Sequence, residues 1–239
     1  MTVRVGILAA MPEERVHFGD HLQIERSDTS AGLRFDIGTL DGNPVALVEC
    51  GIGKVNAALA ATLLCEKYGC GALVFSGVAG GLDPALGVGD VVIATSVVQH
   101  DYGALRAERI EPYRPGALPT IPPTEPPELD ADPAMIEAAR KAMVGIEPTW
   151  FGRVLTGDTY LACAVTRDCL RALHGGVAID MESAAVAQIA VAYGVRWLIV
   201  RAMSDLAGED SQLDFHAFVD RAARVAADAV RRLVPVAGV

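Results

Sequence analysis

The sequence predicts one α/β domain with a central mixed, largely parallel sheet flanked by helices. Three observations indicate this class. The length of 239 residues is ordinary for one α/β domain, and 51% of the residues are hydrophobic, enough for a sizeable core. Strand-like runs alternate with helical stretches, and most of these runs are apolar throughout, as in strands covered on both faces. No internal repeat or boundary divides the chain, so a single domain is expected over residues 1–239.

The first half of the chain is expected to form five strands and two helices. The strand-like runs are residues 3–9, 33–40, 44–50, 73–76 and 90–98. Asp41 and Gly42 separate the second run from the third, a pair typical of tight hairpins. Pro12 suits the first turn of a helix, and an Ala/Leu-rich stretch over 54–68 predicts a longer helix that Gly69 can end.

The second half begins with a segment rich in proline. Residues 112–133 hold eight of the 13 prolines, which predicts an irregular excursion without helix or strand. Asp132 then marks the start of a helix that extends to residue 144, and Gly194 marks the end of an Ala-rich one. The remaining elements are strands over 153–157, 177–180 and 197–203, and helices over 166–173, 182–193 and about 214–233.

Charge and composition exclude several classes of function. The formal charge is −10 and no basic run occurs, which argues against nucleic acid as a partner. No apolar stretch approaches the ~18 residues of a membrane span, so no membrane partner is expected. The five cysteines are an odd number without a regular framework, which predicts reduced thiols and a cytoplasmic protein. They form no C-x-x-C pair, which argues against a zinc site, and no metal or other cofactor is expected.

Carboxylates follow several of the predicted strands. Glu14, Glu182 and Asp205 come at such ends, where α/β sheets gather their ligands. Two carboxylates on opposite sides of a scissile bond are what glycosidic hydrolysis requires. Taken singly, each has an ordinary structural interpretation, as a partner of a helix dipole or a turn residue. The pair His100 and Asp101 has no nucleophile motif nearby, which favours a structural hydrogen-bond role.

Seven motifs in order resemble those of the bacterial 5′-methylthioadenosine/S-adenosylhomocysteine nucleosidases, a family of the nucleoside phosphorylase superfamily. They are AMPEE (10–14), GIGKV (51–55), SGVAGGL (76–82), GVGD (87–90), GD (157–158), DMESA (180–184) and RAMSD (201–205). The resemblance runs from Val3 to about Phe218. It implies a nucleoside phosphorylase-like fold and hydrolysis of the N-glycosidic bond between adenine and a 5′-thio-substituted ribose.

The resemblance also implies roles for individual residues. Asp205 matches the acid that protonates adenine N7, and Glu14 matches the base that activates water; Glu13 fits the register less well. Glu182 matches the residue that accepts hydrogen bonds from the ribose hydroxyls, and Arg201 lies near it in the family. The other substrate-binding residues implied are Met11, Ile52, Val78, Ala79, Gly80, Tyr160, Leu161, Met181 and Ser204.

Two departures from the family pattern leave alternatives open. Val78 stands where the family often has a serine that contacts water, a contact that is either lost or supplied by Ser76. The segment 104–130 is longer than expected; such a loop often closes the neighbouring subunit's pocket, so a homodimer is expected. Relatives that cleave futalosine or adenosylhopane share most of the motifs.

Two further functions compete with hydrolysis. A purine nucleoside phosphorylase needs a basic phosphate cradle, whereas Glu13 and Glu14 would repel phosphate. A non-catalytic nucleoside-binding module would not need both the acid and the base.

Overall fold

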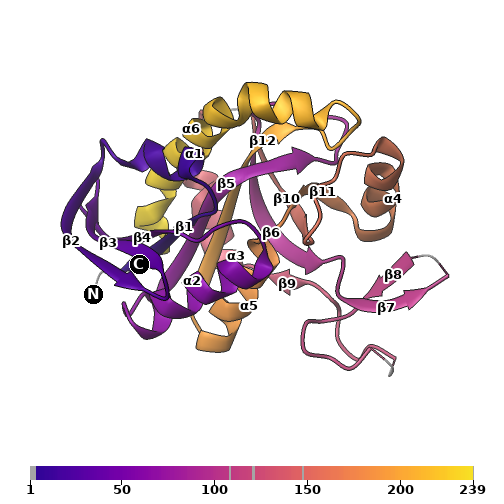
Figure 1. The fold of residues 1–239 in the computed structure, drawn as a ribbon, viewed down its shortest axis with the longest axis horizontal. Helices are drawn as coiled ribbons and strands as arrows, with labels where there is room; N and C mark the ends of the chain where they lie inside the picture. Colours follow the sequence, from indigo (N-terminus) through magenta and orange to yellow (C-terminus); the bar gives the residue numbers. More distant parts are fainter. Residues whose placement is uncertain (1–3, 108, 120–121, 147, 239) are drawn as a thin grey trace.

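A computed structural model describes residues 4–107, 109–119, 122–146 and 148–238. Nine strands form a continuous sheet in the order β11-β10-β6-β12-β5-β1-β4-β3-β2 (Figure 1). These strands are β1 (Val5–Ala9), β2 (Leu22–Ser30), β3 (Leu33–Leu40), β4 (Asn43–Glu49), β5 (Ala72–Gly81), β6 (Val91–Gln99), β10 (Thr149–Thr156), β11 (Gly176–Asp180) and β12 (Arg196–Asp205).

Parallel and antiparallel pairs both occur, so the predicted mixed sheet is confirmed. Parallel pairs join β1 to β4 and β5, β5 to β12, and β10 to β6 and β11. Antiparallel pairs include the predicted β3–β4 hairpin, in which Asp41 and Gly42 both have positive φ. The antiparallel pairs β6–β12 and β5–β11 were not predicted. Because β11 also pairs with β5, strands β5, β12, β6, β10 and β11 close into a ring.

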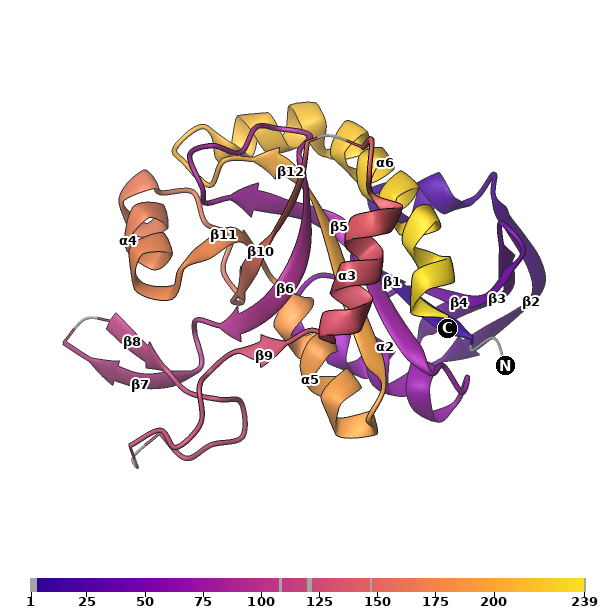
Figure 2. The same cartoon turned by 180° about the vertical axis from the view of Figure 1, so that it is seen from behind.

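Helices cover both faces of the sheet (Figure 1, Figure 2). One face carries α1 (Pro12–Arg15), α3 (Pro133–Ala142) and α6 (Ser211–Ala237), and the other carries α2 (Lys54–Glu66) and α5 (Ser183–Tyr193). Helix α4 (Ala164–His174) packs beside β11. The predicted signals at helix ends are confirmed: the Asp132 carboxylate accepts the N–H of Met135 at 2.8 Å, and Gly194 has φ of 65°. Among the described residues, no helix is both long and apolar enough to span a membrane.

Two expectations about strands were wrong. Strand β2 was missed because it lies at the edge of the sheet, where most of its side chains are exposed and polar. Strand β5 continues through the glycines that were expected to leave the sheet. A Cβ at Gly77 would overlap the Arg201 and Glu14 side chains, so this glycine permits a close approach rather than a turn.

The proline-rich segment is also more ordered than expected. Within it β9 (Leu129–Asp130) pairs with β6, and just before it β8 (Arg109–Pro112) forms a separate hairpin with β7 (Gly103–Arg106). Residues 120 and 121 of this segment lie outside the described residues.

Candidate active site

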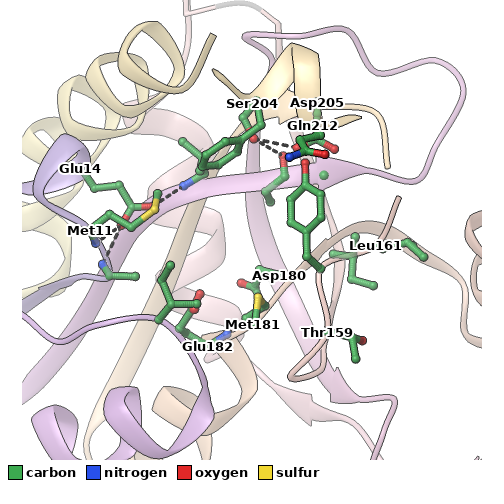
Figure 3. A pocket seen from close by; sticks show the side chains of 18 of the residues that line it. Met11, Glu14, Thr159, Leu161, Asp180, Met181, Glu182, Ser204, Asp205 and Gln212 are labelled. Atoms are coloured by element: carbon green, nitrogen blue, oxygen red, sulfur yellow. Dashed lines mark hydrogen bonds between the residues drawn. The ribbon is translucent and has the colours of Figure 1, made fainter. Parts of the chain in front are cut away.

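A cavity of about 540 Å³ opens at the carboxyl ends of the central strands (Figure 3). Its walls come from the ends of β1, β5, β11 and β12, the loop before α2, the segment between β10 and α4, and the first turns of α6. The lining residues are Ala10, Met11, Glu14, Ile52, Val78, Ala79, Gly80, Thr159, Tyr160, Leu161, Ile179, Asp180, Met181, Glu182, Ser204, Asp205, Gln212, Phe215 and His216.

The structure brings together all the predicted site residues except one along this lining. Arg201 is the exception, because its guanidinium is fully buried behind the cavity wall. Five lining residues had not been singled out: Thr159, Ile179, Gln212, Phe215 and His216. The last three lie in α6, and only the three-dimensional packing of that helix over the ends of β5 and β12 brings them to the cavity.

Glu14 is held in place by backbone donors from two elements. One carboxylate oxygen accepts the N–H groups of Ala10 (2.6 Å) and Met11 (3.1 Å), and the other accepts the N–H of Val78 (2.9 Å). Burial raises the pKa of Glu14, while nearby Arg201 and these three donors oppose the rise. The result is a rigid, desolvated carboxylate with raised proton affinity.

Asp205 lies on the opposite side of the cavity from Glu14 (Figure 3). Its carboxylate accepts the N–H of Ala207 at 2.9 Å and the hydroxyl of Ser204 at 3.0 Å. Burial raises the pKa of Asp205 and the nearby Asp214 adds to the rise, whereas these two hydrogen bonds oppose it. Asp205 therefore has a greater tendency to carry a proton near neutral pH than an exposed aspartate.

Behind the cavity, Arg201 organises two further carboxylates. Its Nη2 lies 2.7 Å from Asp180 and 3.2 Å from Glu182, and its guanidinium stacks on the ring of Phe75 at 4.0 Å. Asp180 also accepts the hydroxyl of Thr156 at 2.7 Å. Arg201 therefore holds Glu182 in position from behind the cavity wall, which corrects the expectation that Arg201 is itself one of the substrate-binding residues of the pocket.

Glu182 accepts hydrogen bonds from two sides of the site. In addition to Arg201, its Oε1 accepts the N–H of Gly53, at the start of α2, at 2.9 Å. Burial raises the pKa of Glu182 to about 7; Asp180 and Glu14 add to the rise, and Arg201 opposes it. The three carboxylates of Glu14, Asp180 and Glu182 share one guanidinium, so this side of the cavity favours positive charge in a ligand.

Neither Val78 nor Ser76 offers a hydroxyl group to the cavity, where the family often has a serine that contacts water. Val78 lines the cavity but also packs against Ala222, Ala223 and Ala226 of α6. Ser76 is fully buried, and its hydroxyl has no hydrogen-bond partner within the described ranges. It is not part of the cavity lining, so of the two alternatives the loss of the serine contact fits better than its supply by Ser76.

The far side of the cavity is aromatic. Tyr160 and Phe215 meet edge to face, with ring centroids 6.1 Å apart, and both line the cavity. Burial raises the pKa of Tyr160 to about 12, and Asp205 and Asp214 add to the rise, so the phenol stays neutral. Tyr160 belongs to residues 158–163, an irregular stretch that we call the strap. No N–H of residues 159–162 donates to another described residue, which leaves these donors open to a ligand.

No metal centre emerges from the described part of the chain, which holds no cluster of three His, Cys, Asp or Glu side chains arranged as ligands. The lining also contains neither lysine nor arginine. It offers an aromatic wall of Tyr160 and Phe215 together with four carboxylates, those of Glu14, Asp180, Glu182 and Asp205. This arrangement suits acid–base cleavage of a planar base from a sugar.

Comparisons with known proteins agree with this geometry. The model of the phosphorylase superfamily matches residues 4–235. A 5′-methylthioadenosine/S-adenosylhomocysteine nucleosidase of Mycobacterium tuberculosis is 44% identical over 99% of this chain and 98% of its own length. The enzyme of the same name from Bacillus thuringiensis is 38% identical, over 92% of this chain and 94% of its own.

Solved structures show the same similarity. The S. pneumoniae nucleosidase, determined with a transition-state inhibitor, superposes with a TM-score of 0.85 at 28% identity, covering 98% of this chain and 99% of its own. The futalosine hydrolase of Helicobacter pylori reaches 0.86 at 26% identity, covering 98% of both chains. The chain therefore belongs to the phosphorylase superfamily and, within it, to the 5′-methylthioadenosine/S-adenosylhomocysteine nucleosidase family.

Proposed function

We propose that the protein hydrolyses the N-glycosidic bond of 5′-thio-substituted adenine nucleosides, 5′-methylthioadenosine and S-adenosylhomocysteine, and releases adenine. One observation carries the proposal: Glu14 and Asp205 face one cavity from opposite sides, with Glu182 on a third side (Figure 3). The names of the relatives support the choice of substrate.

In this reaction Asp205 is the general acid. Adenine is a poor leaving group as an anion, so a proton must reach N7 as the bond to the sugar breaks. Burial keeps the proton affinity of Asp205 high, and Ser204 and Ala207 fix its carboxyl group. General acid catalysis of this kind typically contributes ~10²–10⁴-fold to the rate.

Glu14 is the general base for the attacking water. Both of its oxygens are held by backbone donors, so the carboxylate cannot turn away from the cavity. Its raised pKa makes the ionised carboxylate a better proton acceptor than that of an exposed glutamate. Because Val78 lacks a hydroxyl and Ser76 lies elsewhere, Glu14 is the main holder of that water.

Glu182 binds the ribose hydroxyls, and its charge also acts on the transition state. The sugar becomes cationic as the bond to adenine breaks. The excess of carboxylates around Arg201 stabilises that positive charge more than the neutral substrate, which is how preorganised electrostatics lowers a barrier.

Adenine binds beside Tyr160 and Phe215, with its edge towards the backbone of the strap. Tyr160 offers a ring face for stacking, and the open N–H groups of residues 159–162 lie where the edge of the base can be read. Met11, Met181 and Phe215 supply apolar surface for the thioalkyl group.

We also propose that the protein is a homodimer. Helices α2 and α5 lie side by side, and only the two terminal residues of α2, Lys54 and Glu66, are charged. Val55, Leu59 and Val191 of these helices expose 80%, 41% and 50% of their surface. Helices that are apolar on all sides are normally buried, so a second copy covering this face fits best. The segment 104–130 is proposed to help close the partner's pocket.

Release of the free base tests the proposal, measured with and without phosphate as adenine from methylthioadenosine, S-adenosylhomocysteine and adenosine, and as hypoxanthine from inosine and futalosine. We expect rapid release from the two thio-nucleosides at a rate that phosphate does not change. Preference for futalosine would reassign the substrate. Dependence on phosphate would assign the chain to the phosphorylases, although a cavity lined by neither lysine nor arginine offers no cradle for that anion.

A further inference from the structure

A charged cluster outside the cavity joins three segments that build it. We call Lys54, Asp101 and Asp158 the clamp. Lys54 Nζ lies 2.6 Å from Asp101 and 3.7 Å from Asp158. Lys54 begins α2, Asp101 follows β6, and Asp158 begins the strap. None of the three residues lines the cavity, and the proposed chemistry does not use them.

Backbone hydrogen bonds turn this cluster into a closed ring. Asp101 Oδ2 accepts the N–H of Asp158, and Asp158 Oδ1 accepts the N–H of Lys54, both at 2.9 Å. Burial raises the pKa of Asp101, but Lys54 and this N–H outweigh burial and lower it overall, so Asp101 is charged at neutral pH. Asp158 supplies the cap that Gly53, which has no side chain, cannot give α2.

Each end of the ring leads directly to a different half of the cavity. On one side, Gly53 precedes Lys54 and donates its N–H to Glu182, the proposed ribose ligand. On the other side, Asp158 is followed by Thr159, Tyr160 and Leu161, which line the proposed base site. The N–H groups of residues 159–162 donate to no other described residue, so hydrogen bonds fix the strap only at its two ends.

Gly157, which precedes the strap, is fixed by a hydrogen bond and by close packing. Gly157 donates its N–H to Asp180 at 3.1 Å, and a Cβ at this position would overlap the ring of His100. At the other end, Ala164 donates to Glu209 at 3.2 Å. Between these ends the strap is supported by side-chain packing, of Tyr160 on Phe215 and of Leu161 on a buried apolar cluster, so the clamp is its charged hydrogen-bonded anchor.

We propose that Lys54, Asp101 and Asp158 are positioning residues that hold the base-binding strap at a fixed distance from the ribose-binding start of α2. This inference rests on the proposed function and deepens it. Through the clamp, helix α2 and the preceding Gly53 fix the positions of both the Glu182 carboxylate and the strap. The affinity for free adenine, which contacts the strap but not the ribose site, then depends on a charged pair that lies outside the cavity lining.

The test compares Lys54→Met, Asp101→Asn and the double variant with wild type. We expect the KM for methylthioadenosine and the inhibition constant of adenine to rise together, on the order of tenfold, below the ~10²-fold that a 1 Å misplacement can cost. The value of kcat should change less. The double variant should be no worse than the worse single one, because both substitutions break the same pair. Lys54→Arg keeps the charge and should retain most of the affinity.

Arg231→Met is the matched control. Arg231 pairs with Asp41 at 2.8 Å with similar exposure, but far from the cavity lining in the fold. It should lower Tm at most and leave KM and the adenine constant unchanged. Clamp variants that behave like this control would overturn the inference while leaving the proposed function intact. Wild-type protein that neither cleaves methylthioadenosine nor binds adenine would overturn both.

Discussion

Asp205 and Glu14 show how two residues of the same acidic kind receive different tasks from their surroundings. Burial raises the pKa of both. Glu14 accepts three backbone N–H groups and lies near Arg201, which favour its ionised form. Asp205 has no cation among the causes of its shift, and Asp214 nearby disfavours its charge. The environments therefore favour Glu14 as the base and Asp205 as the acid.

Asp205→Asn should abolish turnover while leaving binding largely intact. Asparagine keeps the shape and can hydrogen-bond to N7, but it cannot deliver a proton. We expect kcat to fall towards ~10⁴-fold, the upper end for general acid catalysis, because adenine is a poor leaving group. Calorimetric titration with methylthioadenosine should still show binding. Near-normal kcat in this variant would mean that another group is the acid.

Glu14→Gln should also be strongly damaging, for the opposite reason. Glutamine can hold water but cannot accept its proton, so kcat should fall by at least ~10²-fold. If Glu14 served only the dipole of α1, the substitution would instead cost about 0.3–1 kcal/mol of stability and little activity. Parallel measurement of kcat and Tm separates these two interpretations.

The free energy of unfolding should depend on pH through Glu182. Its pKa is about 7 in the folded protein against an ordinary 4.5, so the folded state binds more protons between these values. Its contribution to stability is therefore present below about pH 4.5 and is lost as pH rises towards 7. Urea unfolding of wild type and Glu182→Gln across this range should show a steeper decline in wild type. Parallel curves for the two proteins would contradict the assignment.

At the scale of the residue, ordered motifs made most of the site predictable. They could not show that Arg201 lies behind the wall, since burial depends on how β12 packs between β5 and β6. Nor could they reveal Phe215 or His216, because contact of α6 with the cavity is a tertiary property. The position of Ser76 followed from strand β5 continuing where a loop was expected.

At the scale of the element, local signals were reliable where one residue type satisfies a backbone need. Gly194, Asp132 and the Asp41-Gly42 pair each mark an end or a turn that the structure contains. The hydrophobic pattern failed to predict β2, because most side chains of this edge strand are exposed and polar. Glycine was also a misleading sign of a loop in β5, where Gly77 allows the Arg201 and Glu14 side chains to pack closely against the strand.

The cap of α3 gives a measurable prediction at this scale. Asp132→Ala removes the acceptor for the N–H of Met135 and should cost ~1 kcal/mol of stability, within the usual range for a lost cap. Asp132→Asn keeps an acceptor and should cost less. Glu137→Ala, at an exposed position on the same helix, is the control and should stay within about 0.5 kcal/mol of wild type. Equal losses for all three variants would show that the cap contributes nothing specific.

At the scale of the whole molecule, alternating apolar runs predicted an α/β sheet, but not the ring that β11 closes with β5. That closure depends on contacts between segments distant in sequence, which a pattern of hydrophobicity does not encode. The predicted cytoplasmic location and the assembly stay predictions.

The proposed dimer is tested by light scattering. We expect twice the 25.1 kDa chain mass at micromolar concentration. Leu59→Lys together with Val191→Lys should yield monomers, because charges on the apolar face of α2 and α5 must then be buried. A monomeric wild-type protein would refute the dimer and leave that face unexplained.

The central claim is that water, and not phosphate, attacks the ribose of a thio-adenine nucleoside in this cavity. The most direct measurement is mass spectrometry of the sugar formed from methylthioadenosine in ¹⁸O-labelled water that also contains phosphate. We predict free methylthioribose that carries one ¹⁸O atom, released together with adenine. A methylthioribose 1-phosphate product would contradict the account.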